Sequence, residues 1–451
     1  MNDSFVVSDN QNVSGNGLTI PWTGIAKVMI AALLLVPSEI YRLPVTLPFD
    51  LDVYRVVIII VLVIWATALM LEPEIKFRAT PFDLMIAFLM LSVFLSLLVN
   101  LSSYEPNQEF ADAIKGTVFF ASFFLVFYFL ISTIKMKQEA EEVLRHIVLL
   151  AGFVAFFGII ERFTEYNVFR HLHEWIPIFE VRNAKVVMRG GAIRMAGSVV
   201  HPIAFTAILA MVAPLAFHYW QTANEKNKKV LFGCATALII MALLLSGSRT
   251  SFVALLGVMF ILFLGLPAKR RLIVVALLLS TFIVHMLAPG SLDIIRTMLS
   301  PDYIRQAEIG NKFGRIEDYP RIWAEFSKRP AFGLGYYAFR PEKFFFVDNQ
   351  YLKFLVEIGL LGTVAIVSFC FSIPLWLWRS SRELEVADKS LLVSLCASCM
   401  AFMITCATFD AFGFSQVPYL FFIISALGIT YVLDIKNKFE FNTNAIDHLT
   451  G

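Results

Sequence analysis

Ionisable residues at the edges of long apolar stretches are the first candidates for chemistry, because charged groups near a bilayer are costly and tend to be functional. Four such places stand out in this chain: Arg194 to Pro202, Ser246 to Ser251, Val347 to Leu352, and Phe409 to Gln416. Arginine side chains can stabilise a departing diphosphate, and a carboxylate can take a proton from a hydroxyl. Together the four places predict a site for anion binding and acid/base chemistry.

Each place also has a plain structural explanation, which the residues alone leave open. Arg249 opens an apolar stretch, where helix N-terminal N–H groups favour an anion, but an arginine beside a tight reversal can also simply snorkel to the membrane surface. Asp348 is a candidate general base and equally a candidate helix cap. His201, Asn349 and Asp410 are candidate substrate contacts.

Composition places the chain in a membrane. Of its 451 residues, 58% are apolar and 16% are charged, and 37 Lys and Arg against 35 Asp and Glu give a net charge of +2. Soluble proteins carry roughly 25% charged and about 45–50% apolar residues. The values exclude an ordinary soluble enzyme, a disordered protein and a nucleic-acid binder with a basic face. The 44 Phe residues suit a lipid-facing surface.

The elements that must position the candidate residues are membrane-spanning helices. About 20 apolar residues cross the hydrocarbon core of a bilayer, and twelve stretches of this chain are predicted to do so. They lie at about 22–38, 53–71, 81–100, 113–134, 146–162, 198–220, 230–247, 251–266, 272–288, 347–370, 390–408 and 417–434. The predicted fold is an all-α polytopic integral membrane protein with about twelve transmembrane helices.

Lysine and arginine mark one side of this stack. If the N-terminus is cytoplasmic, six short segments on that side hold 16 basic residues, whereas the short turns 101–112 and 409–416 on the other side hold none. Because cytoplasmic loops are enriched in Lys and Arg, both termini are predicted to be cytoplasmic. The expected organisation is a disordered cytoplasmic tail over 1–21, a single transmembrane domain over 22–434 and a cytoplasmic tail over 435–451.

Two longer segments on the predicted periplasmic side break the charge pattern. Residues 163–197 form a medium loop and residues 289–346 a large one, and ten of their fourteen basic residues are arginine. The planar guanidinium suits phosphate and carboxylate. Solvated loop charge explains any single arginine, but the two loops as a set favour an anion-binding site. The candidate arginines in them are Arg189, Arg194, Arg315 and Arg321.

At these residues the chain resembles the O-antigen ligase and polymerase superfamily of bacterial envelope assembly. The resemblance is best from about Arg194 to Gln416. One matching piece is the Ser-Gly-Ser-Arg-Thr turn at 246–250. A second, at the end of the large loop, is Arg-Pro-Ala-Phe-Gly-Leu-Gly-Tyr at 329–336.

A third matching piece separates the branches of the superfamily. Asp348-Asn349 is followed, after nine residues, by Gly359-Leu-Leu-Gly362. Ligases usually have His-Asn at this start with the same gap to the glycines. Asp-Asn is more similar to the polymerase branch, the Wzy-type enzymes that join repeat units.

The resemblance implies a GT-C-like glycosyltransferase in the bacterial inner membrane, with its active site facing the periplasm. The donor would be an undecaprenyl-diphosphate-linked glycan and the acceptor a second glycan, without metal, cofactor or nucleic acid. Asp348, Arg249 and Arg315 would be catalytic. The substrate-binding residues would be Arg189, Arg194, His201, Arg321, Asn349 and Asp410. Chain-length regulator and flippase proteins are candidate partners.

Three functions stay open at this point. The favoured one is a polymerase that joins lipid-linked repeat units into O-antigen or exopolysaccharide. The first alternative is a ligase that transfers lipid-linked polysaccharide to a lipid A-core acceptor. The second is a solute transporter, since twelve spans are common among transporters. Transporters typically contain an internal repeat, and the two halves of this chain show none.

Overall fold

The computed structural model describes residues 20–38, 40–42, 52–104, 109–176, 180–181, 188–189, 192–246, 248–287 and 315–450. Most of the predicted tail 1–21 and residues 289–314 of the predicted large loop lie outside the described residues. Within the described ranges the chain is almost entirely helical, with four strands of two residues each.

Each of the twelve predicted stretches contains a helix. In chain order these are α1 (Trp22–Leu35), α2 (Val53–Leu71), α3 (Asp83–Val99), α4 (Glu109–Thr133), α5 (Lys137–Thr164), α7 (Pro202–Thr222), α8 (Lys226–Leu245), α9 (Arg249–Gly265), α10 (Ala268–Leu287), α14 (Gln350–Ser380), α15 (Val386–Cys406) and α16 (Gln416–Thr450).

Eight of these helices are long and apolar enough to cross a membrane, judged over the described residues, and α1, α3 and most of α9 form shorter apolar helices. An all-α polytopic architecture is therefore confirmed, with eight clear spans among the described residues, and the count of twelve stays a prediction. α16 runs on to Thr450, so the stretch predicted as a tail after 434 continues the last helix.

Small elements occupy the long loops. The medium loop holds η2 (Val168–His171), α6 (Leu172–Trp175), β2 (Glu180–Val181), β3 (Met188–Arg189) and β4 (Ala192–Ile193), and the described part of the large loop begins with α13 (Arg315–Lys328). β1 (Tyr41–Arg42) pairs antiparallel with β2, and β3 pairs antiparallel with β4. The 3-10 turns η1 (Leu101–Ser103), η3 (Ser381–Glu383) and η4 (Ala411–Gly413) lie between helices.

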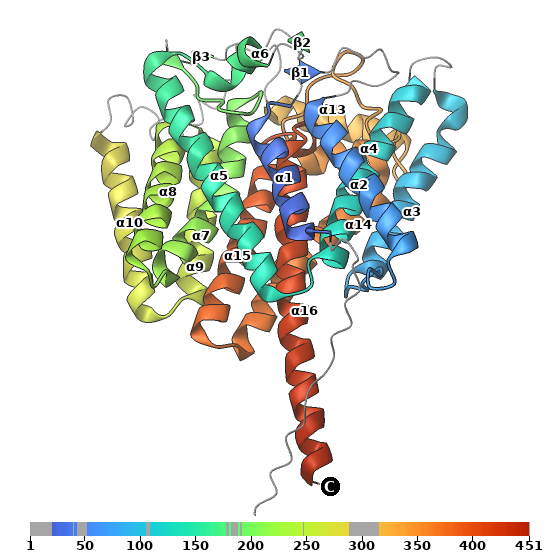
Figure 1. Ribbon diagram of the computed structural model, residues 1–451. Coiled ribbons are helices and arrows are strands. Elements are labelled where there is room, and N and C mark those ends of the chain that lie inside the picture. Colours follow the sequence, from blue (N-terminus) through green and yellow to red (C-terminus); the bar gives the residue numbers. More distant parts are fainter. Residues whose placement is uncertain are drawn as a thin grey trace, which may run out of the picture.

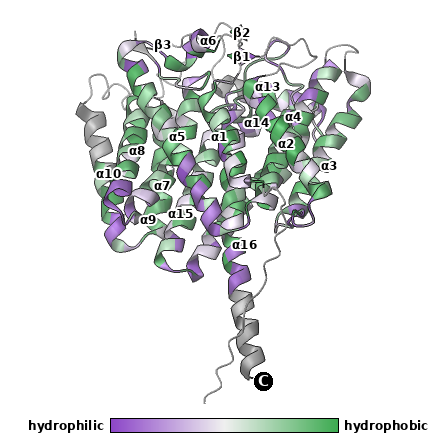
Figure 2. Ribbon diagram, in the orientation of Figure 1, coloured by the Kyte–Doolittle hydropathy of each residue, from purple (hydrophilic) through white to green (hydrophobic). Residues whose placement is uncertain are grey.

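The connections sort to two ends of the bundle (Figure 1). One end, here called the loop end, holds the described parts of segment 163–201 together with segments 315–349 and 407–415. The opposite end, called the basic end, holds the short connections between α4 and α5, α7 and α8, α9 and α10, and α14 and α15. Hydrophobic residues dominate the middle of the bundle, and hydrophilic residues gather in the connections at both ends (Figure 2).

Three helices form the centre of the bundle. Within their most apolar windows, 94% of the residues of α16, 89% of those of α7 and 83% of those of α15 are buried, against 28% for α2. Phenylalanine rings pack this centre: Phe402 and Phe421 stack with ring centroids 4.2 Å apart. The peripheral helices therefore carry the lipid-facing surface, as the excess of apolar residues predicted.

α14 is broken at Gly359, where the backbone has φ 67° and ψ −170°. A side chain would be strained in this left-handed conformation, and its Cβ would lie 2.4 Å from the carbonyl oxygen of Ala331. The break divides α14 into a first piece, 350–358, and a second piece, 360–380. Backbone groups freed inside a membrane protein need partners, so another segment must supply them here.

Candidate functional site

The glycine-rich segment 329–335 completes the broken helix. Its backbone exchanges hydrogen bonds with both pieces of α14: Leu334 N–H to the Val356 carbonyl at 2.9 Å, Gly335 N–H to the Glu357 carbonyl at 2.7 Å, and Leu360 N–H to the Pro330 carbonyl at 2.8 Å. Gly333, with φ 67°, lies so close that a Cβ would stand 2.6 Å from the Glu357 backbone. The two glycine motifs of the sequence are thus the two sides of one contact.

Polar side chains at the end of α3 bond to the same segment and to α14. They donate to backbone carbonyls: Asn100 to Gly333 at 2.8 Å, Tyr104 to Leu334 at 2.9 Å, and Ser96 to Glu357 at 3.2 Å. Burial raises the pKa of Tyr104 to about 12, so its hydroxyl stays protonated and remains a donor at neutral pH. The loop end is therefore fixed by directed hydrogen bonds rather than by apolar packing alone.

Two of the four places predicted from the sequence, Val347 to Leu352 and Phe409 to Gln416, meet with their neighbouring residues at the start of this broken helix. Three contacts join them: the Asn349 amide to the Ala407 carbonyl at 3.1 Å, Phe412 N–H to Gln350 Oε1 at 2.8 Å, and Lys353 Nζ to Asp410 Oδ2 at 2.6 Å. The Lys353 and Asp410 side chains are only 12% and 14% exposed. A buried ion pair therefore ties the first piece of α14 to the turn between α15 and α16.

The predicted place Arg194 to Pro202 contacts the place Phe409 to Gln416 through Gln416. Its amide nitrogen donates to the Leu33 carbonyl at 2.6 Å and to the Ser198 carbonyl at 3.2 Å. The ring of His201 lies 5.4 Å from that of Phe414, centroid to centroid. Residues far apart in the sequence thus surround one region of the loop end.

A buried carboxylate on α5 shapes the approach to α7. Glu161 Oε2 accepts the backbone N–H groups of Ala196 at 3.0 Å and Gly197 at 2.8 Å. Gly197 has φ 54°, a conformation that favours glycine. Arg194 precedes this turn directly after β4, so Glu161 fixes the backbone that carries Arg194.

His201 is neutral in this surrounding. Its Nδ1 accepts the Ile203 backbone N–H at 3.3 Å, which caps α7. Burial, and to a smaller extent the nearby positive charge of Arg194, lowers the pKa of His201 to about 4. Near pH 7 the ring is therefore an uncharged hydrogen-bonding group, and the cation of this place is Arg194.

Asn349, not Asp348, caps α14. Asn349 Oδ1 accepts the backbone N–H groups of Tyr351 at 3.0 Å and Leu352 at 3.2 Å. The cap explanation that the sequence left open for Asp348 is therefore wrong. Asp348 is half-buried, immediately before the cap, at the mouth of the site.

The second place lies at the same end of the bundle. Arg249 is the first residue of α9, a helix that packs against α7 and α15. Arg315 opens α13, and Arg189 stands in β3 opposite Ala192. The side chains of these three arginines lie outside the described residues, so their predicted roles stay predictions. The guanidinium of Arg321 stacks on Phe345, 3.9 Å from the ring centroid.

Three charged residues of this region were not predicted from the sequence: Lys353, Glu357 and Glu161. Glu357 is 1% exposed and lies one helical turn after Lys353. A signal was present, because charges four residues apart share one face of a helix and both stand inside an apolar run. Both residues lie in the piece of α14 before the break.

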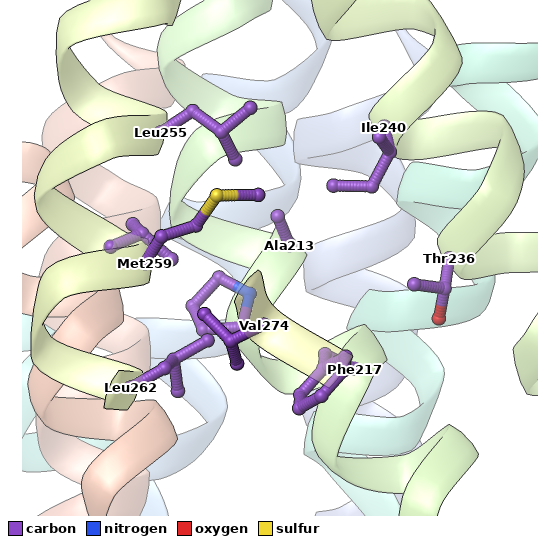
Figure 3. Close-up of a pocket in the computed structure, with 10 residues that line it drawn as sticks. Ala213, Phe217, Thr236, Ile240, Leu255, Met259, Leu262 and Val274 are labelled. Atoms are coloured by element: carbon purple, nitrogen blue, oxygen red, sulfur yellow. The ribbon is translucent and has the colours of Figure 1, made fainter. Parts of the chain in front are cut away.

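A separate pocket lies between α7, α8, α9 and α10 (Figure 3). It holds about 340 Å³ of empty space, part of it open to the surroundings. Apart from Thr236, its lining residues are apolar: Ala213, Pro214, Phe217, Ile240, Leu255, Val258, Met259, Leu262 and Val274. This lining suits hydrocarbon, and the pocket is distinct from the charged site at the loop end.

Fold and site together define a polytopic helical membrane protein with a charged site at one end of its bundle, where glycines allow close backbone contacts. Residues 234–367 match the family model described as O-antigen ligase. All three motifs on which the superfamily resemblance was based lie within the matched residues, and that resemblance is confirmed.

Other comparisons add little. A comparison with curated proteins gives no match. One similar solved structure is described as "Structural coordination of polymerization and crosslinking by a peptidoglycan synthase complex". Its chain shares 14% sequence identity with this one at a TM-score of 0.40, over 78% of this chain and 96% of that chain. A likeness of that degree supports no functional argument.

Proposed function

We propose that this protein is a bacterial inner-membrane glycosyltransferase that polymerises undecaprenyl-diphosphate-linked repeat units into O-antigen or exopolysaccharide. The family match supports a ligase or polymerase acting on lipid-linked glycans. The observation that carries the polymerase choice is Asp348-Asn349 at the mouth of the broken helix, where ligases usually have His-Asn. The loop end is proposed to face the periplasm, because the 16 predicted cytoplasmic basic residues belong to the other side.

The proposed chemistry is the transfer of the donor glycan to an acceptor hydroxyl in a single step. A hydroxyl oxygen of the acceptor glycan attacks the anomeric carbon of the donor, and the bond between that carbon and the diphosphate breaks. Asp348 takes the hydroxyl proton, and undecaprenyl diphosphate leaves with the bonding electrons. Arg249, Arg315 and Arg194 stabilise the growing charge of the diphosphate, a role that guanidinium groups can fill without a metal.

The surroundings of Asp348 support this assignment. The carboxylate precedes a helix whose cap is supplied by its neighbour Asn349, so Asp348 is not needed for capping. The Lys353–Asp410 pair fixes the helix that follows. A base held by rigid elements keeps its geometry toward the substrate, which catalysis requires.

A ligase is the second candidate, because the matching family model is described as O-antigen ligase. In that case the acceptor hydroxyl would belong to a lipid A-core rather than to a second repeat unit. The transfer step would be the same, and Asp348 would replace the usual histidine of the ligases.

Deleting the gene and separating envelope polysaccharide by gel electrophoresis distinguishes the two. Single repeat units on the acceptor, without long chains, support a polymerase. Loss of all attached polysaccharide, with long lipid-linked chains retained, supports a ligase. An unchanged polysaccharide pattern contradicts both functions and leaves the transporter to be tested.

A further inference from the structure

Tyr337 is held in a left-handed backbone conformation, with φ 65°. Among the described residues other than glycine, Glu165 is the only other one with positive φ. Such a conformation is unfavourable for a residue with a side chain, and it persists where the surroundings enforce it, often at binding sites.

The enforcing contacts come from α14 and α4. The buried carboxyl group of Glu357 lies beside the backbone of Tyr337 and Phe339, and the Glu357 carbonyl accepts the Gly335 N–H at 2.7 Å. On α4, Gly116 leaves room for Tyr337: a Cβ at Gly116 would lie 2.4 Å from the Cβ of Tyr337. Gly335, with φ 108°, turns the chain toward this position. Two helices and the turn at Gly335 thus determine where Tyr337 points.

The ring that results is displayed rather than buried. Tyr337 is 46% exposed, whereas Tyr336 before it is 3% exposed and Phe339 after it is 2% exposed. Core packing therefore does not explain the strained backbone, because the neighbours fill the core and Tyr337 does not.

The displayed ring lies beside the charged groups of the site. Lys353 Nζ stands 5.9 Å from the centre of the Tyr337 ring and is paired with Asp410. A pyranose ring matches this combination, because its C–H face packs on an aromatic ring while its hydroxyls bond to ammonium and carboxylate groups. A hydrocarbon chain would cover these polar groups without offering them a hydrogen bond.

We propose that Tyr337 is a stacking platform for a pyranose ring of the acceptor glycan, and that Glu357 is the positioning residue that holds it. This inference rests on the proposed function and adds to it a sugar-binding contact. Because the contact is an aromatic surface, it acts on binding rather than on the bond-making step.

The test uses the purified full-length protein in lipid nanodiscs, with lipid-linked repeat units extracted from a strain that lacks the gene. Tyr337→Ala is expected to raise KM for these units about three- to tenfold, the range of an aromatic contact, with kcat within about twofold. Tyr337→Phe is expected to behave as wild type. Tyr166→Ala is the matched control, because Tyr166 is 44% exposed at the same end.

Tyr337→Gly separates the binding role from a structural one. Glycine adopts φ 65° without strain, so Tyr337→Gly should unfold at a temperature no lower than that of Tyr337→Ala. Its KM should be raised as much as the KM of Tyr337→Ala, because both variants lack the ring. Glu357→Gln keeps an acceptor oxygen and should bind as wild type, whereas Glu357→Leu should raise KM. Adding Tyr337→Ala to Glu357→Leu should raise KM no further, because coupled residues are not additive.

The outcomes distinguish failure of the stacking role from failure of the proposed function. An active wild type with unchanged KM in Tyr337→Ala overturns the stacking role alone. An equal rise of KM in Tyr166→Ala overturns it too, since any exposed ring would then matter. A wild type that transfers no sugar from these units overturns the proposed function, and the stacking role with it.

Discussion

The two ends of the bundle are built differently. All six described residues with positive φ lie at the loop end: Glu165, Gly197, Gly333, Gly335, Tyr337 and Gly359. The basic end, over the described residues, has short connections without such conformations. Its ion pairs are mostly partly or fully exposed, as in Lys228–Glu225, whose side chains are 60% and 66% exposed. The loop end instead buries the Lys353–Asp410 pair.

The difference indicates which end works. Exposed ion pairs contribute little to stability and tolerate replacement, so the basic end needs only to sit at a membrane surface. Strained backbones and buried charges are costly, and they persist where function requires a fixed geometry. Substitutions at the loop end should therefore have large effects, and matched substitutions at the basic end small ones.

The largest expected effect is on catalysis at Asp348. Asp348→Asn should lower the rate of sugar transfer by about 10²–10⁴-fold, the usual contribution of a general base. The helix cap stays intact because Asn349 supplies it. Chain-length distributions at matched membrane levels check this, with Glu342→Gln, an exposed carboxylate of the same loop, as the control. Near-normal polymer from Asp348→Asn would move the base to Asp410 or His201.

Breaking the buried ion pair should strongly destabilise the fold. Lys353→Met leaves Asp410 buried without its partner, which typically costs about 3–5 kcal/mol. Lys228→Met, which breaks an exposed pair at the basic end, should cost less than about 1 kcal/mol. Unfolding both variants in detergent with heat or denaturant, and measuring their free energies of unfolding, compares the two ends directly. Equal shifts would contradict the distinction between them.

Replacing single arginines should lower the transfer rate at the loop end and leave it unchanged at the basic end. Arg194→Ala, Arg249→Ala and Arg315→Ala should each lower transfer by about 10²–10³-fold, as expected for a group that stabilises transition-state charge. Lysine should restore little activity because it lacks the planar fork. Arg382→Ala, at an exposed position of the basic end, should leave the rate unchanged. Full activity of Arg249→Lys together with Arg315→Lys would argue against diphosphate binding.

The smallest effect is a pH dependence of stability at His201. Its pKa is about 4 in the folded protein, lowered from 6.5, so the unfolded chain binds more protons between these values. Stability from this group is complete above about pH 6.5 and falls as the pH drops toward 4. Replacing His201 with Asn should flatten the melting temperature over that window. An identical pH profile in both proteins would show that His201 does not titrate as described.

The helices were predictable and the site only partly so. All twelve apolar stretches contain helices because backbone groups in lipid must be paired within the segment. Over the described residues, α1, α3 and most of α9 are too short to count among the eight clear spans. The four polar places were found from charge position alone, and three of them are joined by hydrogen bonds or ring contacts.

The remaining features depend on contacts between distant segments. The Lys353–Asp410 pair joins residues 57 positions apart, and no local pattern specifies such a partner. The break in α14 exists because segment 329–335 replaces the missing helical hydrogen bonds. The choice of Asn349 over Asp348 as the cap follows from backbone geometry, since both residue types cap equally well.

Breaking α14 at Gly359 also leaves a second piece whose length suits one crossing of a bilayer. The second piece, 360–380, rises about 30 Å at 1.5 Å per residue, which matches a hydrocarbon core of about 30 Å. With the second piece spanning the membrane, the first piece, with Lys353 and Glu357, would lie at headgroup level. Under the proposed function, a lipid-linked donor would then present its diphosphate to this half-helix while its tail stays in its own leaflet, so no part of the lipid need be lifted out of the membrane for reaction.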